Sequence, residues 1–363
     1  MSSSTLTPMM QQYMETKEQY KDCILFYRLG DFYEMFFDDA LTVTKELDIT
    51  LTGKNCGLEE RAPMCGVPYH AVEGYLTKLV QKGYKVAICE QVEDPKLAKG
   101  IVKREVVRIV TPGTNINTQA LDETKNNYIM CIVYIADRYG LSVADVSTGD
   151  YFVTELDSGR KLLDEIAKFS PSEIICNESL YMSGLDLEDL KNRLGITIYS
   201  LDAWYFDDGM CTKVLKDHFK VSSLEGLGLT DYNCGLIAAG ALLQYLYETQ
   251  KTSLAHLTGI ISYTTGKYML LDSSSRRNLE LCETLREKQK RGSLLWVLDK
   301  TKTAMGARTL RSFVEQPLIH KEEVIKRLDA VGELKDDAIS REEIRESLTP
   351  VYDLERLISK ISY

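Results

Sequence analysis

The chain has 363 residues, 44% of them hydrophobic, and a formal net charge of −10 at pH 7. This length predicts two or three domains, each large enough for a hydrophobic core. There is no run of about 18 apolar residues and no signal segment, so we expect a cytoplasmic protein without a membrane span. The nine cysteines never occur in Cys-x-x-Cys spacing and the four histidines lack ligand spacing, which argues against a disulfide framework or a metal site.

The acidic net charge argues against a nucleic-acid partner, but the basic residues are unevenly distributed. Five basic residues and one acidic residue lie between Lys96 and Arg108, and ten basic and four acidic residues lie between Arg276 and Arg311. Charged runs are commonly solvated faces. They are also the means by which proteins neutralise DNA phosphates, so both interpretations stay open here.

The stretch from Arg28 to Asp39 carries the most specific pattern in the first part of the chain. An apolar run at residues 24–27 predicts a buried strand at 24–28, and Gly30-Asp31 predicts a turn after it. Apolar residues then recur at helical spacing, which predicts a helix from near Asp31 to about Leu47. Phe32 and Glu34 lie off its apolar stripe. They are either part of a capping box begun by Asp31 or an exposed functional pair.

The remainder of residues 1–115 predicts one α/β domain. Glycine and proline residues, which favour turns, separate the expected elements. These are a strand at 47–52, a loop at 53–63, a helix at 71–82, and strands at 85–90 and 104–110. The polar stretch at 116–127 is predicted to be a linker.

Residues 128–250 predict a second α/β domain. Three strands at 128–135, 141–147 and 151–156 are expected, with turns at Tyr139-Gly140 and Gly149-Asp150, then a helix at 159–168 and a strand at 173–176. Three antiparallel strands followed by a helix and a strand are typical of the RNase H-like fold. A nuclease on that fold needs several carboxylates around metal ions. Only Asp145 lies well placed in a strand, whereas Asp137 and Asp150 fall in turns, which argues against nuclease activity.

Residues 251–363 predict the beginning of an all-α region. The sequence becomes helical near Leu236, a short strand is expected at 268–271, and helices at 321–336 and 352–361 carry apolar stripes that need partners. A phosphate-binding P-loop requires Gly-x-x-x-x-Gly-Lys-Ser/Thr, and neither Gly53-Lys54 nor Gly266-Lys267 fits it. We therefore expect no cofactor site and no enzymatic activity in this chain.

Phe32-Tyr33-Glu34 resembles the Phe-x-Glu motif of the MutS family of DNA mismatch-repair proteins. The resemblance extends through further blocks in the same order along the chain. These blocks are residues 8–13, 26–36, 66–72, 86–91, 104–114, 242–245, 276–280 and 305–308.

The resemblance implies a mismatch-recognition domain, an RNase H-like connector domain and the start of a helical lever domain. In the family, the residue matching Phe32 stacks on a mispaired base from the minor groove, and the residue matching Glu34 hydrogen-bonds to that base. A mispair is weakly stacked, so wedging it open costs less than wedging a matched step. Next to such a motif, the basic run supplies candidate contacts to the DNA backbone, namely Lys99, Lys103, Arg104 and Arg108.

The family further implies a homodimer, a downstream partner of the MutL type, and an ATPase with ATP and Mg²⁺ in its full-length members. We expect that ATPase to lie beyond residue 363, so that this chain is an N-terminal portion of a larger protein. Two alternative functions remain open from the sequence. One is a protein-interaction scaffold in which the connector recruits a repair partner without DNA selectivity, and the other is a metal nuclease on the connector.

Overall fold

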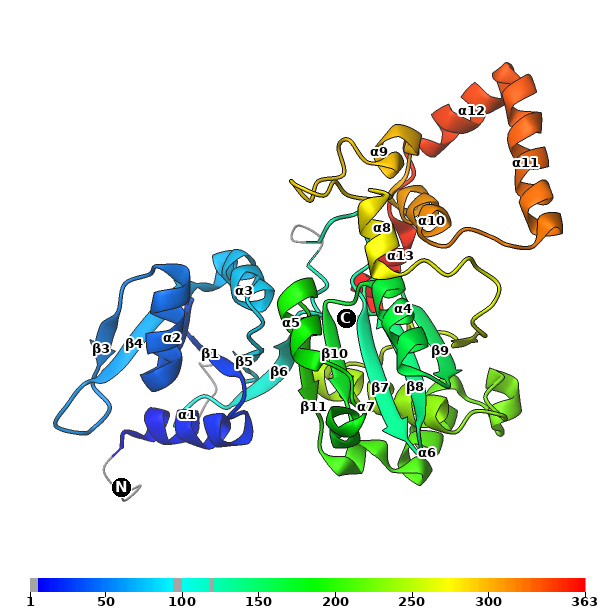
Figure 1. Cartoon of the computed structure of the whole chain (residues 1–363). Helices are drawn as coiled ribbons and strands as arrows, with labels where there is room; N and C mark the ends of the chain where they lie inside the picture. The colour runs from blue at the N-terminus through cyan, green and yellow to red at the C-terminus, as the bar shows by residue number, and fades with distance from the viewer. Residues whose placement is uncertain (1–5, 94–99, 118–120, 363) are drawn as a thin grey trace. The chain divides into compact units, whose positions relative to one another are not determined.

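The computed structural model describes residues 6–93, 100–117 and 121–362. They divide into two compact units, which are described separately (Figure 1). The first comprises the first 120 residues with Leu246–Ser253, and the second comprises Leu121–Tyr245 with Leu254–Tyr363. Both units contain a mixed sheet, and a helical region ends the chain, as the sequence predicts. Among the described residues, no helix is both long and apolar enough to cross a bilayer.

The first unit is built on a six-stranded sheet in the order β3-β4-β2-β1-β5-β6. The pairing of β1 with β5 is parallel, and the other neighbouring pairs are antiparallel. The strands are β1 Ile24–Leu29, β2 Phe32–Phe36, β3 Thr52–Lys54, β4 Ala62–Pro68, β5 Val86–Gln91 and β6 Arg104–Val110.

Helices cover both faces of this sheet. The helices α2 (Phe37–Leu47) and α3 (Val72–Gln81) pack on one face, where Phe26 and Met35 are fully buried. Helix α1 (Pro8–Gln19) packs on the other face against Leu25 and Tyr27. Because β1 is covered on both sides, its sequence is apolar at consecutive positions rather than at alternate ones.

The helix predicted from Asp31 is wrong over its first turns, because residues 32–36 form β2. Strand β2 is hydrogen-bonded to β1 on one side and to β4 on the other, so its backbone groups are satisfied by a ladder. Helix α2 begins only at Phe37, which has a φ of +52°. The Asp31–Glu34 capping box therefore does not form.

The start of α2 is held by Asp39 instead. This carboxylate is buried and accepts hydrogen bonds from the Leu25 amide and from Lys17 Nζ, both at 2.9 Å. These bonds tie α2 to β1 and to α1, and they compensate for the burial of the charge.

Two other predictions for this unit need correction. The strand expected at 47–52 lies later, at β3, and the loop expected at 53–63 contains the end of β3 and the start of β4. Strand β3 has three residues at the edge of the sheet, and such a short strand has too little alternation to be detected from sequence. The helix at 71–82 and the strands at 24–28, 85–90 and 104–110 are confirmed within one or two residues.

The second unit contains a six-stranded sheet in the order β11-β10-β7-β8-β9-β12. Strands β7, β8 and β9 form an antiparallel meander, and β10 and β11 extend it in parallel from β7. The strands are β7 Ile129–Ile135, β8 Arg138–Asp145, β9 Asp150–Leu156, β10 Glu173–Cys176, β11 Thr197–Ser200 and β12 Ile261–Ser262. Strands β7 to β10 occur in the chain order that the sequence predicts, whereas the sequence does not predict β11 and β12.

The turn predicted at Tyr139-Gly140 is wrong, because both residues lie inside β8. The chain turns at Ala136 and Asp137, which have φ values of +49° and +60°. Gly140 instead allows the backbone of Cys234 to pack closely against β8, because a Cβ at position 140 would lie 2.0 Å from that backbone.

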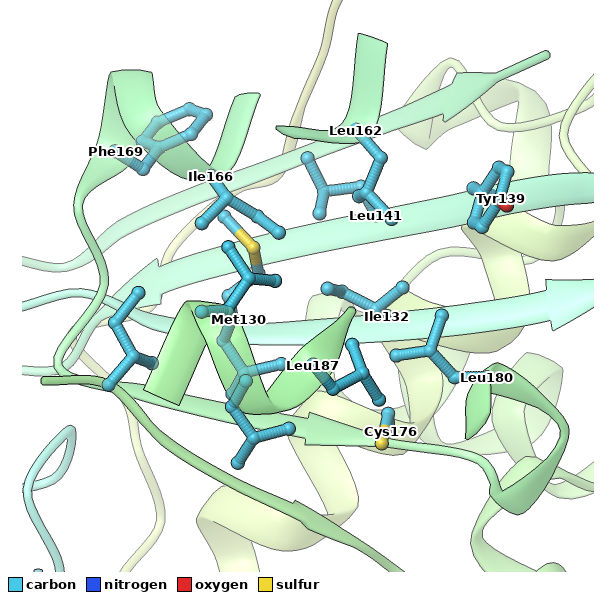
Figure 2. Close-up of a cluster of buried hydrophobic side chains, with 14 of the residues drawn as sticks. Met130, Ile132, Tyr139, Leu141, Leu162, Ile166, Phe169, Cys176, Leu180 and Leu187 are labelled. Carbon is cyan, nitrogen blue, oxygen red and sulfur yellow. The ribbon is translucent and has the colours of Figure 1, made fainter. Parts of the chain in front are cut away.

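A hydrophobic cluster lies between this sheet and the helices α4 (Gly159–Phe169) and α5 (Leu187–Leu194) (Figure 2). Met130, Ile132 and Leu141 project from the strands toward Leu162 and Ile166 of α4, and all five are at most 1% exposed. Two further helices, α6 (Asp208–Phe219) and α7 (Cys234–Gln250), follow in the chain. The predicted burial of the apolar run near Leu236 is confirmed.

Short elements complete the chain up to residue 262. They are the 3₁₀ helices η1 Tyr69–Ala71, η2 Glu178–Met182, η3 Ala203–Phe206 and η4 Leu224–Leu227.

The rest of the chain is helical. Its helices are α8 Ser273–Asn278, α9 Leu294–Leu298, α10 Ala304–Glu315, α11 Lys321–Asp336, α12 Ala338–Leu348 and α13 Leu354–Ser362. Helix α11 has the predicted bounds, and its apolar stripe is exposed, with Leu328 at 61% and Val331 at 63%. The strand expected at 268–271 is reduced to an isolated bridge between Tyr268 and Leu318.

Arg308 of α10 ties the helical region to the segment that precedes β7. Its guanidinium donates to both carboxylate oxygens of Asp353 at 2.7 and 2.8 Å, to Glu355 at 2.6 Å and to the Glu123 carbonyl at 2.9 Å. Burial opposes ionisation of Asp353, but the bonds from Arg308 outweigh it and hold the pKa of Asp353 below its ordinary value. Arg356 adds a bond of 2.7 Å to the Lys125 carbonyl.

We expect Arg308→Gln to lower the free energy of unfolding of the second unit by about 3 kcal/mol, because it leaves partly buried acceptors without their charged donor. Trp204 and Trp296 are the only tryptophans of the chain and both belong to this unit, so urea denaturation followed by tryptophan fluorescence reports on it. The control is Arg345→Gln, whose exposed pairing with Glu342 contributes little. Equal losses in the two variants would contradict this prediction.

Candidate nucleic-acid interface

The candidate site is organised by the hairpin that joins β1 to β2. Leu29 is paired with Phe32, so Gly30 and Asp31 form a two-residue turn. Gly30 has a φ of +59°, which glycine adopts without the steric cost of a Cβ atom. A glycine at the first turn position is typical of tight hairpins. Phe32 therefore lies at the first position after the turn, at one end of the sheet.

Strand geometry places Phe32 and Glu34 on the same face of the sheet, because alternate side chains of a strand point the same way. The intervening Tyr33 and the following Met35 point into the core on the other face, where they are 5% and 0% exposed. Phe32 is 47% exposed, an unusual value for a large aromatic side chain in a strand with neighbours on both sides.

Gly66 of β4 lies beside this pair. It is the register partner of Glu34, and a Cβ built on it would lie 3.5 Å from Glu34 Cγ and 3.9 Å from Phe32 Cδ1. Gly66 is exposed and has no side chain, so the backbone next to Phe32 is left uncovered on this face of the sheet. A ligand that reaches the ring of Phe32 can therefore approach the sheet closely.

Glu34 forms an ion pair with Lys54 of β3, with 2.5 Å between Oε2 and Nζ. The side chains are 17% and 33% exposed, so the pair is partly shielded from water. Lys54 Nζ also lies 5.6 Å from the centroid of the Phe36 ring. A positive charge is thus held directly against the candidate carboxylate.

The opposite face of the hairpin is fixed by a polar cluster. The Tyr33 hydroxyl donates to Glu90, and Arg28 lies 3.6 Å from Glu90 and 4.0 Å from the centroid of the Tyr69 ring. Burial, together with the neighbouring Glu90 carboxylate, raises the pKa of Tyr33 above its ordinary value. The Tyr69 amide donates to the Asp31 carbonyl at 2.9 Å and so holds the turn itself. The strand that carries Phe32 is therefore rigidly supported.

The four basic candidates have different environments. Lys103 is exposed, and its ion pair with Glu105 at 2.5 Å raises its pKa. Arg104 is turned toward the protein, where it donates to the Arg28 carbonyl at 2.7 Å and to Gln12 at 3.0 Å. Arg108 is partly buried and donates to the Thr114 carbonyl at 3.3 Å. Lys99 lies outside the described residues.

The carboxylates considered for a nuclease serve the fold of the second unit. Asp145 is fully buried and accepts bonds from Asn126, from the Asn127 amide and from Ser147. Asn126 also donates to Asp150 at 3.0 Å. No group of three potential metal ligands occurs among the described residues. The donor-rich surroundings of Asp145 match a structural carboxylate.

This face of the sheet thus brings together the exposed ring of Phe32, the ion pair of Glu34 with Lys54, and the uncovered backbone at Gly66. An exposed ring can stack on a base, and the ion pair can offer a hydrogen-bond acceptor or donor to a base edge. Sequence reasoning did not identify Lys54 or Gly66 as part of this group. Only the strand register brings them to Glu34, and no local pattern signals it.

Models of known families match nearly the whole chain. MutS domain I matches residues 7–119, MutS domain II matches residues 127–258, and MutS domain III matches residues 274–363. The matches follow one another without overlap and in the order expected from the sequence motifs.

Three similar curated proteins carry the name DNA mismatch repair protein MutS. The one from Lachnoclostridium phytofermentans is 70% identical over 358 residues, the one from Ruminiclostridium cellulolyticum is 55% identical over 360, and the one from Acetivibrio thermocellus is 53% identical over 361. These alignments cover 99%, 98% and 99% of this chain, but only 38%, 41% and 41% of the relatives. The chain therefore spans about two fifths of their length.

Proposed function

This chain belongs to the MutS family, of which it carries domains I to III, and on that premise we propose that it recognises mispaired or unpaired bases in duplex DNA. The observation that carries this proposal is the side-by-side placement of the half-exposed Phe32 and of Glu34 on one face of β2. The names of the relatives, which contain the words DNA mismatch repair, support it.

In the proposed mechanism, the ring of Phe32 enters the duplex from the minor groove and stacks on a base of the mispair. Inserting a wedge unstacks one base step and bends the duplex, at a cost of a few kcal/mol. A mispaired step is already weakly stacked, so this cost is smaller there than at a matched step. Selectivity then comes from the difference between the two deformation energies.

Glu34 and Lys54 act together in this proposal. The carboxylate of Glu34 hydrogen-bonds to the exposed edge of the mispaired base, while its charge disfavours approach to the phosphates of an undistorted duplex. The ion pair with Lys54 keeps that charge fixed in position while the site is empty. When Glu34 turns to the base, Lys54 becomes available to a neighbouring phosphate.

We propose that Lys103 and Lys99 contact the DNA backbone. The exposed ammonium of Lys103 can exchange Glu105 for a phosphate at little cost, since exposed ion pairs are weak. Lys99 remains a candidate from the sequence. Arg104 and Arg108 are bonded to protein carbonyls, and we assign them to positioning β6 rather than to direct contact.

The wider assignments are proposals as well. They comprise a homodimer, a downstream partner of the MutL type, a cytoplasmic location, and ATP and Mg²⁺ bound by parts of longer family members that this chain does not cover. We also propose the boundaries 1–115 for mismatch recognition, 116–127 for a linker, 128–250 for the connector and 251–363 for the start of the lever.

The function is tested by measuring dissociation constants for matched duplex, G·T duplex and duplex with one unpaired base over a range of salt concentrations. We expect weaker binding as salt rises for all three, because phosphate neutralisation releases counterions. The affinity ratio between mismatched and matched duplex should stay above one throughout. A ratio of one at every salt concentration would contradict the proposal, and it would favour the scaffold hypothesis if a repair partner bound instead.

We expect Phe32→Ala to abolish most of the discrimination, because stacking of a base on an aromatic ring contributes about 1 to 3 kcal/mol. The fold should lose little, since the side chain is 47% exposed. The matched control is Trp204→Ala, which removes an aromatic ring of 48% exposure from the second unit. A variant that unfolds at lower temperature yet keeps its preference for mispairs would show Phe32 to be a core residue.

We expect Glu34→Gln to tighten binding to matched duplex and to narrow the mismatch-to-match ratio. The substitution removes the repulsive charge and releases Lys54, but keeps a hydrogen-bonding group for the base. Glu46→Gln is the control, because it breaks an ion pair of 2.7 Å with Lys82 in the same unit and removes the same charge. An unchanged ratio with a lowered thermal midpoint would restrict Glu34 to a structural ion pair.

A further inference from the structure

A cavity of about 590 Å³ lies within the second unit. One wall is formed by the end of α4, the loop after it and the end of α5. The other wall is formed by α8, α10 and the loop at 281–288. Cavities of this volume suit ligands the size of a nucleotide or a drug. We call it the basic cavity because of the charges that line it.

Eight basic and two acidic side chains line the cavity in the part of the chain that the structure describes. Both acids are already paired, Glu283 with Lys125 and Glu315 with Arg311. By contrast, no acidic group of the described residues lies within ion-pair distance of three of the basic residues. These are Arg276, Arg277 and Lys288. The cavity therefore carries positive charge that the protein does not neutralise.

Arg311 gives the most direct sign of a missing partner. Its side chain is 11% exposed, and a single contact of 3.3 Å joins Nη1 to Glu315. Its Nε and Nη2 atoms are buried and have no hydrogen-bond partner among the described residues. A buried donor of a charged group without an acceptor is destabilising. Arg311 lines the cavity, so an anion bound there would lie beside its guanidinium group.

Two further basic groups of the lining are partly buried. Burial lowers the pKa of Arg276 against the opposing effect of Glu315, and its Nε donates to the Leu271 carbonyl at 2.9 Å. Burial also lowers the pKa of Lys168, which is paired with Glu165 at 3.0 Å. The rest of the lining is mixed. Tyr128 and Phe169 form an aromatic corner with 5.2 Å between ring centroids, and Ser170 and Ser172 add hydroxyl groups.

We propose that the basic cavity binds a small phosphate-bearing ligand of nucleotide size, with its phosphate groups at Arg311 and Arg276 and its less polar part against Tyr128 and Phe169. Guanidinium groups match phosphate oxygens in pairs, which favours phosphate over a simple carboxylate. This site is separate from the Phe32 hairpin and does not depend on it. It belongs to the second unit alone.

The test is a thermal-shift titration of the 363-residue chain, read by tryptophan fluorescence so that the second unit is observed. The probes are inorganic pyrophosphate, ADP, sulfate at matched ionic strength, and a hexaglutamate peptide. A ligand that binds only the folded state raises the midpoint with its concentration. We expect pyrophosphate and ADP to raise it more than sulfate or hexaglutamate does.

Arg311→Gln is the diagnostic variant. Without ligand its midpoint should be equal to or above that of the unmodified chain, because a buried guanidinium with unbonded nitrogens has been removed. Its affinity for pyrophosphate and ADP should fall about tenfold or more, as expected for lost hydrogen bonds to a charged group. Arg345→Gln, outside the cavity, should retain the affinity.

Three results would overturn the proposal. The first is a pyrophosphate shift no larger than that of sulfate, or unchanged in Arg311→Gln. The second is a shift with pyrophosphate but none with ADP, which excludes a nucleotide-sized ligand. The third is a shift with hexaglutamate alone, which would assign the cavity to an acidic peptide segment.

Discussion

The candidate site depends on one structural constraint, the hydrogen-bonding of β2 between β1 and β4. Strand geometry puts residues 32 and 34 on one face and residues 33 and 35 on the other. In a helix, Phe32 and Glu34 would point about 200° apart, and a base could not contact both. The hydrogen-bonded ladder therefore places Phe32 and Glu34 on one face, and Gly30 allows the hairpin turn that precedes β2.

Charged groups are arranged in a similar way in the two units. The chain is acidic overall, yet its important charges are paired with specific partners. Glu34 is held by Lys54 in the first unit, and Asp353 is held by Arg308 in the second. Where pairing is complete, as at Asp145, the group has a structural role. Where it is incomplete, as at Arg311, buried guanidinium nitrogens have no acceptor among the described residues.

Much of the architecture could be predicted from the sequence. Strand-like apolar runs identified β1 and β7, cap and turn signals bounded α3 and β5, and an apolar stripe gave the bounds of α11. These signals are local, because burial on a face repeats with the period of the element itself. Family membership also followed from the sequence, since ordered blocks of motif residues extend along most of the chain. Phe32 and Glu34 were identified by that resemblance and not by periodicity.

Other features were decided only by the tertiary structure. The sequence at 32–36 is compatible with a helix, and its pairing with the adjacent β1 and with β4, which is distant in sequence, makes it β2. The β2–β4 register places Gly66 opposite Glu34, and the pairing of β3 with β4 brings Lys54 to the same carboxylate. Packing turns Arg104 toward the protein. The basic cavity joins segments more than 100 residues apart. Strand pairing and burial are non-local, so a sequence pattern can name the residue types but cannot determine which of them meet.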